Sequence, residues 1–154
     1  LNKNLKHYEF QYKLGLNIDI KEFNPSCSCE SGGLYFTNKE NIIDHLYIGI
    51  YIAEISIPDD AKVYKDPYYN NWKVDKLIIN KYYPIKEWDG WNKQNCLEAV
   101  KNNGCVFQYI PEKFITKEIC ELAVKYTIHT LRYIPEKFKT KELYELVRNG
   151  LVIK

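Results

Sequence analysis

The N-terminal half of the chain alternates apolar and polar residues with a period of two, which is typical of half-buried β-strands. In residues 8–20 the alternating apolar positions are Tyr8, Phe10, Tyr12, Leu14, Leu16, Ile18 and Ile20. Gly15 interrupts the series and indicates a turn. We therefore expect a strand, a turn and a second short strand, each with one apolar face against the core.

Three more segments are rich in β-branched and aromatic residues, which favour strands. They are residues 47–57, Val63–Tyr64 and residues 72–80. Within the first of them the apolar phase shifts, which predicts a β-bulge near Ala53–Glu54. Residues 1–88 are therefore expected to form an α+β domain on a mainly antiparallel sheet.

Residues 23–42 combine a proline turn, two close cysteines and a glycine pair with an apolar-aromatic run. Because glycine adopts backbone angles that cost other residues energy, Gly32-Gly33 predicts a tight bend before a strand at Leu34–Phe36. Thr37, with Glu40 three residues later, predicts a helix N-cap with a capping box. The segment therefore predicts a loop, a strand and a short helix.

The glycine bend is the candidate binding site of this sequence. We expect the first domain to present a pocket or groove that the bend lines. The candidate binding residues are Tyr12, Asn17, Phe23, Gly32, Gly33 and Tyr35.

The C-terminal part repeats itself at an offset of 24 residues. The hexapeptide Tyr109–Phe114 recurs as Tyr133–Phe138. At the same offset lie the pairs Cys96 and Cys120, Ala99 and Ala123, and Val100 and Val124. A fixed period of this size indicates stacked helical units, so residues 89–154 are expected to form helical repeats.

Each repeat is expected to contain a helix of about ten residues, a turn and a short second helical segment broken by proline. Asn92, Thr116 and Thr140 hold the N-cap positions. The positions expected to face neighbouring units are Ala123, Val124 and Leu131, and those expected to face water or a partner are Glu121 and Lys125. Repeats of this kind are scaffolds for contacts rather than seats of chemistry.

The composition argues against several classes of function. The 154 residues include 22 basic and 20 acidic ones, so the net charge of +2 gives little attraction to nucleic acid or anionic lipid. No run approaches the roughly 18 apolar residues of a membrane span. The first ten residues lack the apolar region of a signal peptide. We therefore expect no membrane association and no secretion.

Five cysteines, an odd number at low density, predict a reduced intracellular chain without a disulfide scaffold. Cys27 and Cys29 have ligand-like spacing, and His7 and His45 could complete a set of four ligands. Structural zinc sites usually use two close pairs of ligands instead. We therefore expect no bound metal and no other cofactor.

The sequence gives little support for an enzymatic function. P-loop, dinucleotide, HExxH and nucleophile-elbow motifs are absent from the sequence. Gly33–Phe36 is similar to a strand of ADP-ribosyltransferase folds, in which Glu87 and His7 would stand in for the catalytic glutamate and a dinucleotide-holding residue. Neither residue lies in a matching motif, and His7, His45 and His129 are expected to be structural or surface residues. We expect no enzyme and name no catalytic residue.

Nucleic-acid binding is a further alternative, because lysine and tyrosine interleave in one segment. The residues concerned are Lys73, Lys76, Lys81, Tyr82 and Tyr83. A solvated strand edge that lysines protect from pairing explains the same pattern better. We therefore expect no nucleic-acid partner.

Specific motifs in residues 8–88 resemble the N-terminal domain of many ankyrin-repeat and related proteins of giant viruses of the mimivirus group. They are Gln11-Tyr12-x-x-Gly15-Leu16-Asn17, Phe23-Asn24-Pro25, Cys29, Gly32–Thr37, Ile55 with Pro58, and Lys65-Asp66-Pro67. Residues 95–150 resemble short helical repeats of undefined function found in the same viruses. No ankyrin repeats follow here, which is a departure from the family pattern.

The resemblance implies a giant-virus protein in the host cytoplasm, the viral factory or the virion. Together with the repeats, it predicts a non-enzymatic module for protein–protein interaction. Its partner would be another viral or host protein, and a homo-oligomer is left open as an alternative.

Overall fold

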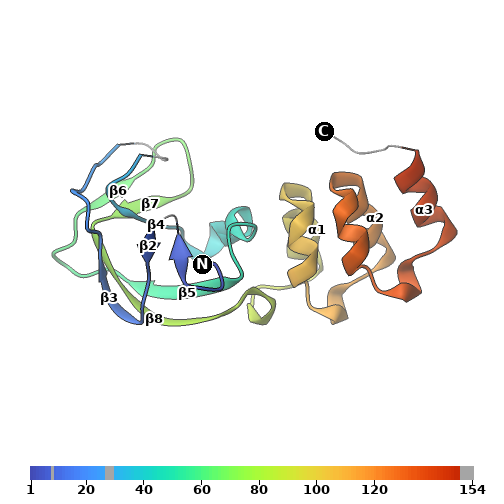
Figure 1. Ribbon diagram of the computed structural model, residues 1–154, viewed down its shortest axis with the longest axis horizontal. Coiled ribbons are helices and arrows are strands. Elements are labelled where there is room, and N and C mark those ends of the chain that lie inside the picture. The colour runs from blue at the N-terminus through green and yellow to red at the C-terminus, as the bar shows by residue number, and fades with distance from the viewer. Residues whose placement is uncertain (8, 27–29, 150–154) are drawn as a thin grey trace. The chain divides into compact units, whose positions relative to one another are not determined.

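The computed structural model describes residues 1–7, 9–26 and 30–149, which form two compact units (Figure 1). The first unit contains Leu1–Ile42 and Ile48–Pro84, and the second contains Ile43–Tyr47 and the chain from Ile85 onward. The sequence predicts a boundary after residue 88, whereas the structure separates the units before Ile85. The strands lie in the first unit and the α-helices in the second, so the predicted α+β class is confirmed.

Within the described part of the first unit, the strands form antiparallel sheets with the orders β1–β2, β3–β8–β5 and β4–β7–β6. The strands are β1 (Lys6–His7), β2 (Phe10–Gln11), β3 (Gly15–Ile18), β4 (Leu34–Phe36), β5 (Tyr51–Ser56), β6 (Val63–Lys65), β7 (Trp72–Val74) and β8 (Lys76–Pro84). The short strand predicted at Val63–Tyr64 is confirmed as β6. The predicted bulge is also confirmed, because the register between β5 and β8 shifts between Glu54 and Ile55.

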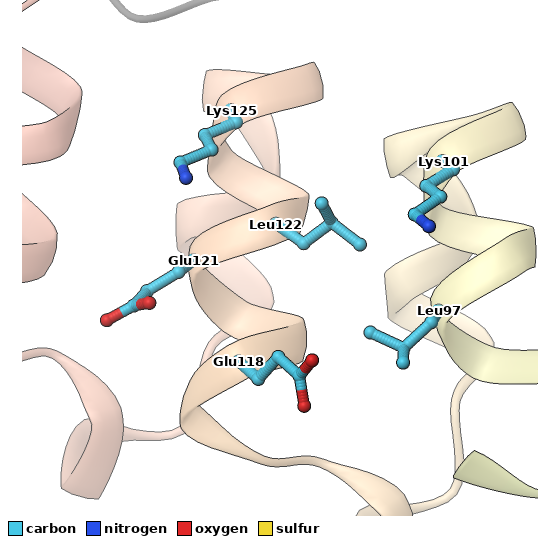
Figure 2. Close-up of a pocket in the computed structure, with 6 residues that line it drawn as sticks. All are labelled: Leu97, Lys101, Glu118, Glu121, Leu122 and Lys125. Atoms are coloured by element: carbon cyan, nitrogen blue, oxygen red, sulfur yellow. The ribbon is translucent and has the colours of Figure 1, made fainter. Parts of the chain in front are cut away.

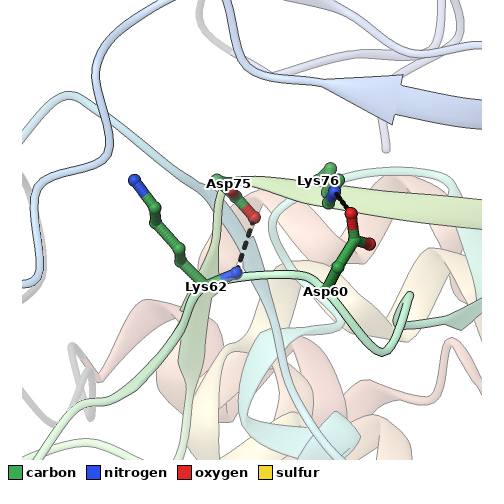
Figure 3. A network of polar contacts seen from close by, with 4 residues as sticks. All are labelled: Asp60, Lys62, Asp75 and Lys76. Atoms are coloured by element: carbon green, nitrogen blue, oxygen red, sulfur yellow. Dashed lines mark hydrogen bonds and ion pairs between the residues drawn. The ribbon is translucent and has the colours of Figure 1, made fainter.

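Residues 72–80 form two strands rather than the single predicted one, because the chain leaves one sheet and enters the next at Asp75. The Asp75 carboxylate accepts a hydrogen bond of 2.9 Å from the Lys62 N–H (Figure 3). The Asp75 carbonyl oxygen accepts one of 2.8 Å from the Asp19 N–H. Beside this crossing, the Lys76 ammonium forms an ion pair with the Asp60 carboxylate, which holds the pKa of Asp60 below its usual value. Asp75 thus joins the β4–β7–β6 sheet to the β3–β8–β5 sheet.

The core of the first unit lies between these two sheets. Its buried side chains are Tyr12, Leu34, Val74, Leu77 and Ile79. Half-buried apolar residues from other strands and loops pack around them, including Phe36, Ala53 and Ile55. Burial of this apolar surface is the main favourable contribution to the stability of the unit.

The prediction that the apolar residues of β3 face the core is wrong. Asn17 is only 2% exposed, whereas Leu16 and Ile18 are 46% and 56% exposed. The turn before the strand explains the reversal, because the Asn17 amide accepts from the Lys13 N–H and donates to the carbonyl oxygens of Lys13 and Gly15. These bonds hold the Asn17 side chain toward the core. Because adjacent residues of a strand point to opposite faces, Leu16 and Ile18 then face away from the core.

The predicted cap at Thr37 is also wrong. The helix that follows is the 3₁₀-helix η1 (Lys39–His45), and the Asn38 side chain accepts the Asn41 N–H at 3.0 Å. The Thr37 hydroxyl instead donates to the Asn70 carbonyl oxygen at 2.7 Å. The chain after η1 stays irregular until β5, so the strand predicted from residue 47 begins four residues late.

The second unit has three α-helices within the described residues, and they lie side by side in chain order (Figure 1). They are α1 (Lys93–Asn102), α2 (Lys117–Tyr126) and α3 (Lys141–Arg148). The predicted caps are confirmed: the side chains of Asn92, Thr116 and Thr140 accept N–H groups three residues later, at 2.9, 3.3 and 3.3 Å. These bonds satisfy N–H groups that the first helical turn leaves without partners.

Short 3₁₀-helices connect the α-helices, as the proline in each repeat predicts. They are η3 (Gly104–Tyr109), η4 (Glu112–Phe114), η5 (Ile128–Tyr133) and η6 (Glu136–Phe138), and η2 (Ile85–Glu87) opens the unit. Ala123 and Val124 are buried as predicted, whereas Leu131 is only half buried. Glu121 and Lys125 are half buried rather than fully in water. None of the helices in the described part of the chain has the length and apolar character needed to cross a bilayer.

Candidate functional site

The glycine bend is a tight crossing of two chain segments. Gly32 and Gly33 have φ angles of +94° and +134°, which residues other than glycine rarely adopt. The Asn24 N–H donates to the Gly32 carbonyl oxygen at 2.9 Å, and the Gly33 N–H donates to the Asp19 carboxylate at 2.6 Å. The predicted bend before β4 is therefore present and is held from two sides.

The side chain of Lys73 on β7 packs against this bend. The residue is 1% exposed, and its ammonium group donates to the Asn24 carbonyl oxygen at 3.0 Å. The same ammonium lies 5.2 Å from the centre of the Tyr35 ring, a cation–π distance. A Cβ atom on Gly33 would come within 2.3 Å of the Lys73 Cγ, so glycine leaves the space that the lysine stem fills.

Glu30 completes the polar side of the bend. Its carboxylate accepts hydrogen bonds from the Ser26 hydroxyl at 2.6 Å and the Asn24 amide at 2.9 Å. These two bonds, and more weakly the Lys73 charge, hold the pKa of Glu30 below its usual value. The Tyr35 hydroxyl donates to the Glu30 carbonyl oxygen at 2.8 Å. The polar groups of the bend therefore bind mainly one another.

The structure separates the six predicted binding residues into two groups. Phe23, Gly32, Gly33 and Tyr35 lie together at the bend. Tyr12 and Asn17 lie in the interior, where Tyr12 is 5% exposed and burial raises the pKa of its hydroxyl well above the usual value. A binding role for any of the six stays a prediction. The two cysteines of the predicted ligand pair, Cys27 and Cys29, lie outside the described residues.

Sequence reasoning missed the role of Lys73, which it placed on a solvated strand edge. The available signal was its place between two large apolar residues in the run Trp72-Lys73-Val74. In the antiparallel register, Lys73 is opposite Tyr35. The register puts the lysine and the aromatic ring on one face, a fact that no single segment reveals.

No three His, Cys, Asp or Glu side chains gather into a metal-binding cluster anywhere in the described ranges. His45, one of the two histidines considered as ligands, has its Nε2 atom buried without a hydrogen-bond partner among the described residues. Burial lowers the pKa of His45, and the nearby charge of Asp44 opposes this effect only in part. Burial likewise lowers the pKa of His7.

We expect the protein to lose stability as the pH falls below about 6.5, the ordinary pKa of histidine. In the folded state His45 holds its proton less tightly than in the unfolded state, so the unfolded state gains protons first. The stability present above pH 6.5 is therefore lost as the pH falls through the lowered folded pKa. Urea unfolding between pH 7.5 and 5 measures this. His45→Gln should flatten the pH profile, and an unchanged profile in that variant would contradict the assignment.

A second candidate site is an open groove between α1 and α2, with a volume of about 190 Å³. The residues that line it are Leu97, Lys101, Glu118, Glu121, Leu122 and Lys125. Leu97 and Leu122 point toward each other across the groove (Figure 2). The groove thus has an apolar centre with charged side chains around it.

The charges of the groove divide into paired and unpaired ones. Glu118 forms an ion pair with Lys93 of α1 at 3.1 Å, and Glu121 forms one with Lys117 at 3.7 Å. For Lys101 and Lys125, the described part of the chain offers no ion-pair partner. They occupy the same position in successive repeats, in the last turn of α1 and of α2. The groove therefore has a basic end whose charges are free for a partner.

The comparisons with known proteins agree with the resemblance predicted from the sequence. Residues 92–139 match the family model described as a domain of unknown function, DUF4116. The chain is 46% identical over 95 residues to R868 of Acanthamoeba polyphaga mimivirus, which carries an ankyrin-repeat name; the match covers 58% of this chain and 47% of R868. It is 38% identical over 90 residues to the uncharacterised protein R869 of the same virus, covering 55% of this chain and 64% of R869.

A third mimivirus relative, R229, also has an ankyrin-repeat name and is 32% identical over 89 residues, or 53% of this chain and 29% of R229. The matched segment thus spans less than two thirds of each of these relatives. No solved structure matches the chain. The predicted resemblance to giant-virus ankyrin-repeat and uncharacterised proteins is confirmed.

Proposed function

We propose that this chain is a non-enzymatic protein–protein interaction module of a giant virus, and that the α1–α2 groove is its docking site. The observation that carries the proposal is the pair of half-buried leucines, Leu97 and Leu122, which meet in an open groove. The names of two relatives refer to ankyrin repeats, a class of stacked repeat that binds other proteins through extended surfaces. The partner would be a viral or host protein.

The repeat itself does not require Leu97. At the 24-residue offset, the position of Leu97 is occupied by Glu121 and Glu145, whereas the position of Leu122 is occupied by Glu98 in the first repeat and Leu146 in the third. The later repeats therefore accept a charged residue at the position of Leu97. A leucine that the repeat does not require, placed opposite Leu122, is better explained by contact with a partner.

The size of the groove favours a side chain over a small-molecule substrate. Small-molecule sites usually enclose roughly 300–1,000 Å³, whereas this groove holds about 190 Å³ and is open to solvent. One apolar side chain of a partner would fill its centre and leave the rim to charged contacts. Such a central apolar anchor with a polar rim is the usual anatomy of a protein interface.

Affinity capture tests the groove. The tagged protein is incubated with lysate of mimivirus-infected amoebae, and retained proteins are measured by quantitative mass spectrometry. The double variant Leu97→Gln/Leu122→Gln should retain about tenfold less of a specific partner, because each 1.4 kcal/mol of lost binding is a factor of ten. The matched control is Ile128→Gln/Tyr144→Gln, which changes two side chains of the same unit that are 43% and 41% exposed outside the groove.

The control should retain the partner like the unaltered chain. Circular dichroism of all three proteins verifies that the helices are intact. Equal capture by the groove variant and the unaltered chain would contradict the proposed docking site. A captured protein that is lost equally from both double variants would contradict it as well.

A further inference from the structure

β3, an edge strand of the β3–β8–β5 sheet, carries exposed apolar residues. Leu16 and Ile18 within the strand are 46% and 56% exposed, and Leu14 and Ile20 in the bends on either side are 58% and 89% exposed. Leu16 and Ile18 are two positions apart, so they share the face of the strand opposite the core. Single exposed apolar residues are ordinary, but four large ones within seven residues, here called the apolar row, indicate an interface.

The same strand also has an unpaired hydrogen-bonding edge. The Asp19 N–H points toward the β8 side, where it donates to the carbonyl oxygen of Asp75, the residue directly before β8. In an antiparallel ladder, alternate residues point at the same neighbour, so the N–H and C=O groups of Leu16 and Ile18 point away from β8. Since β3 is an end strand of its sheet in the part of the chain that the structure describes, these groups can pair with a further strand.

The other edge strands of the two three-stranded sheets differ from β3. β4 has no charged residue, but none of its side chains is exposed. β5 carries the exposed Glu54, paired with Lys81. β6 ends in the exposed Lys65 beside the exposed Val63. Charged side chains of this kind are how monomeric proteins prevent edge-to-edge pairing. The apolar row contains no charge, so the edge of β3 is not protected from pairing with another strand.

We propose that β3 pairs antiparallel with β3 of a second copy of this chain, about a two-fold axis at Asn17. In this register Leu16 lies opposite Ile18 of the other copy. Each copy contributes these two apolar side chains to one face. Because Leu16, Asn17 and Ile18 are uncharged, two identical copies bring no like charges together within the paired strands, which a self-pairing strand requires.

The pairing joins two three-stranded sheets into one of six strands. It also satisfies the main-chain groups of Leu16 and Ile18 in both copies at once, as a two-fold interface does. This dimer does not depend on the α1–α2 groove, which lies in the other unit. It would present two docking grooves in one particle and so raise the apparent affinity for a repeated partner.

Sedimentation equilibrium of the full chain over a wide concentration range tests the association. We expect a reversible monomer–dimer equilibrium. Ile18→Lys should raise the dissociation constant by at least about tenfold, because it puts a charge into the apolar row. The matched control is Val63→Lys, which changes a 52% exposed residue on β6 and should dimerise normally. Circular dichroism verifies that both variants are folded.

Disulfide trapping tests the register. In a chain whose Cys27, Cys29 and Cys105 are changed to Ser, Leu16→Cys protein is mixed with Ile18→Cys protein and oxidised. Opposite residues of an antiparallel pair lie within the distance that a disulfide bridges. The mixture should therefore cross-link in far higher yield than either variant alone.

Three results would overturn the proposal. One is a monomer at every concentration, and a second is a dimer that Ile18→Lys leaves unchanged. The third is equal cross-linking by the mixture and by each variant alone, which would indicate unspecific apolar association. If β3 instead accepts a strand from a different protein, the chain alone stays monomeric and the first of these results is obtained.

Discussion

Gly33→Ala should lower the free energy of unfolding by about 2–6 kcal/mol. Of this, roughly 1–3 kcal/mol is backbone strain, because φ at Gly33 is +134° and an alanine rarely adopts it. The rest is overpacking, typically about 1–3 kcal/mol, since the new Cβ would lie 2.3 Å from Cγ and 2.7 Å from Cδ of Lys73. Chemical denaturation of the variant measures the loss.

Gly15→Ala is the matched control for this experiment. Gly15 also has a positive φ, +80°, but a Cβ there would meet no atom within 4 Å. Only the strain term remains, so this variant should lose clearly less stability. The pair Gly33→Ala and Lys73→Ala should also couple, because the second change removes the atoms that the first one meets. Equal losses for the two glycine variants would show that Lys73 does not fix the bend.

Leu46→Ala should cost about 2–5 kcal/mol of stability, the usual range for emptying a buried leucine site. Leu46 is 2% exposed and belongs to the segment Ile43–Tyr47, which is part of the helical unit although it lies far from it in sequence. The segment is tied to α1 by a hydrogen bond of 2.9 Å from the Asn102 amide to the Asp44 carboxylate. Loss of Leu46 should therefore destabilise the helical repeats.

Thermal unfolding followed by circular dichroism at 222 nm detects this loss. Tyr47→Ala is the control, because Tyr47 is the next residue and is 53% exposed. Its effect should stay within about 0.5 kcal/mol, as for most surface changes. An equal melting temperature for Leu46→Ala and the unaltered chain would show that the inserted segment does not support the helices.

The sequence by itself determined the features that depend on neighbouring residues. The α+β class, the helical repeat and its three caps follow from local periodicity and from side chains that bond N–H groups three residues away. The bulge near Glu54 and the glycine bend follow from local phase and backbone freedom. These signals are readable because each lies within one short segment.

Only the tertiary structure decided which residues meet across the chain. Lys73 is buried because β7 places it opposite Tyr35 and beneath Gly33, and no pattern in residues 72–80 reveals that pairing. Leu97 and Leu122 form a groove because two helices stack at a spacing that the repeat sets. Asn17 faces inward because its side-chain amide closes a turn with Lys13 and Gly15, and this leaves Leu16 and Ile18 exposed on the opposite face of β3. A period of two predicts that a strand has two faces, but long-range packing and turn geometry decide which face the core receives.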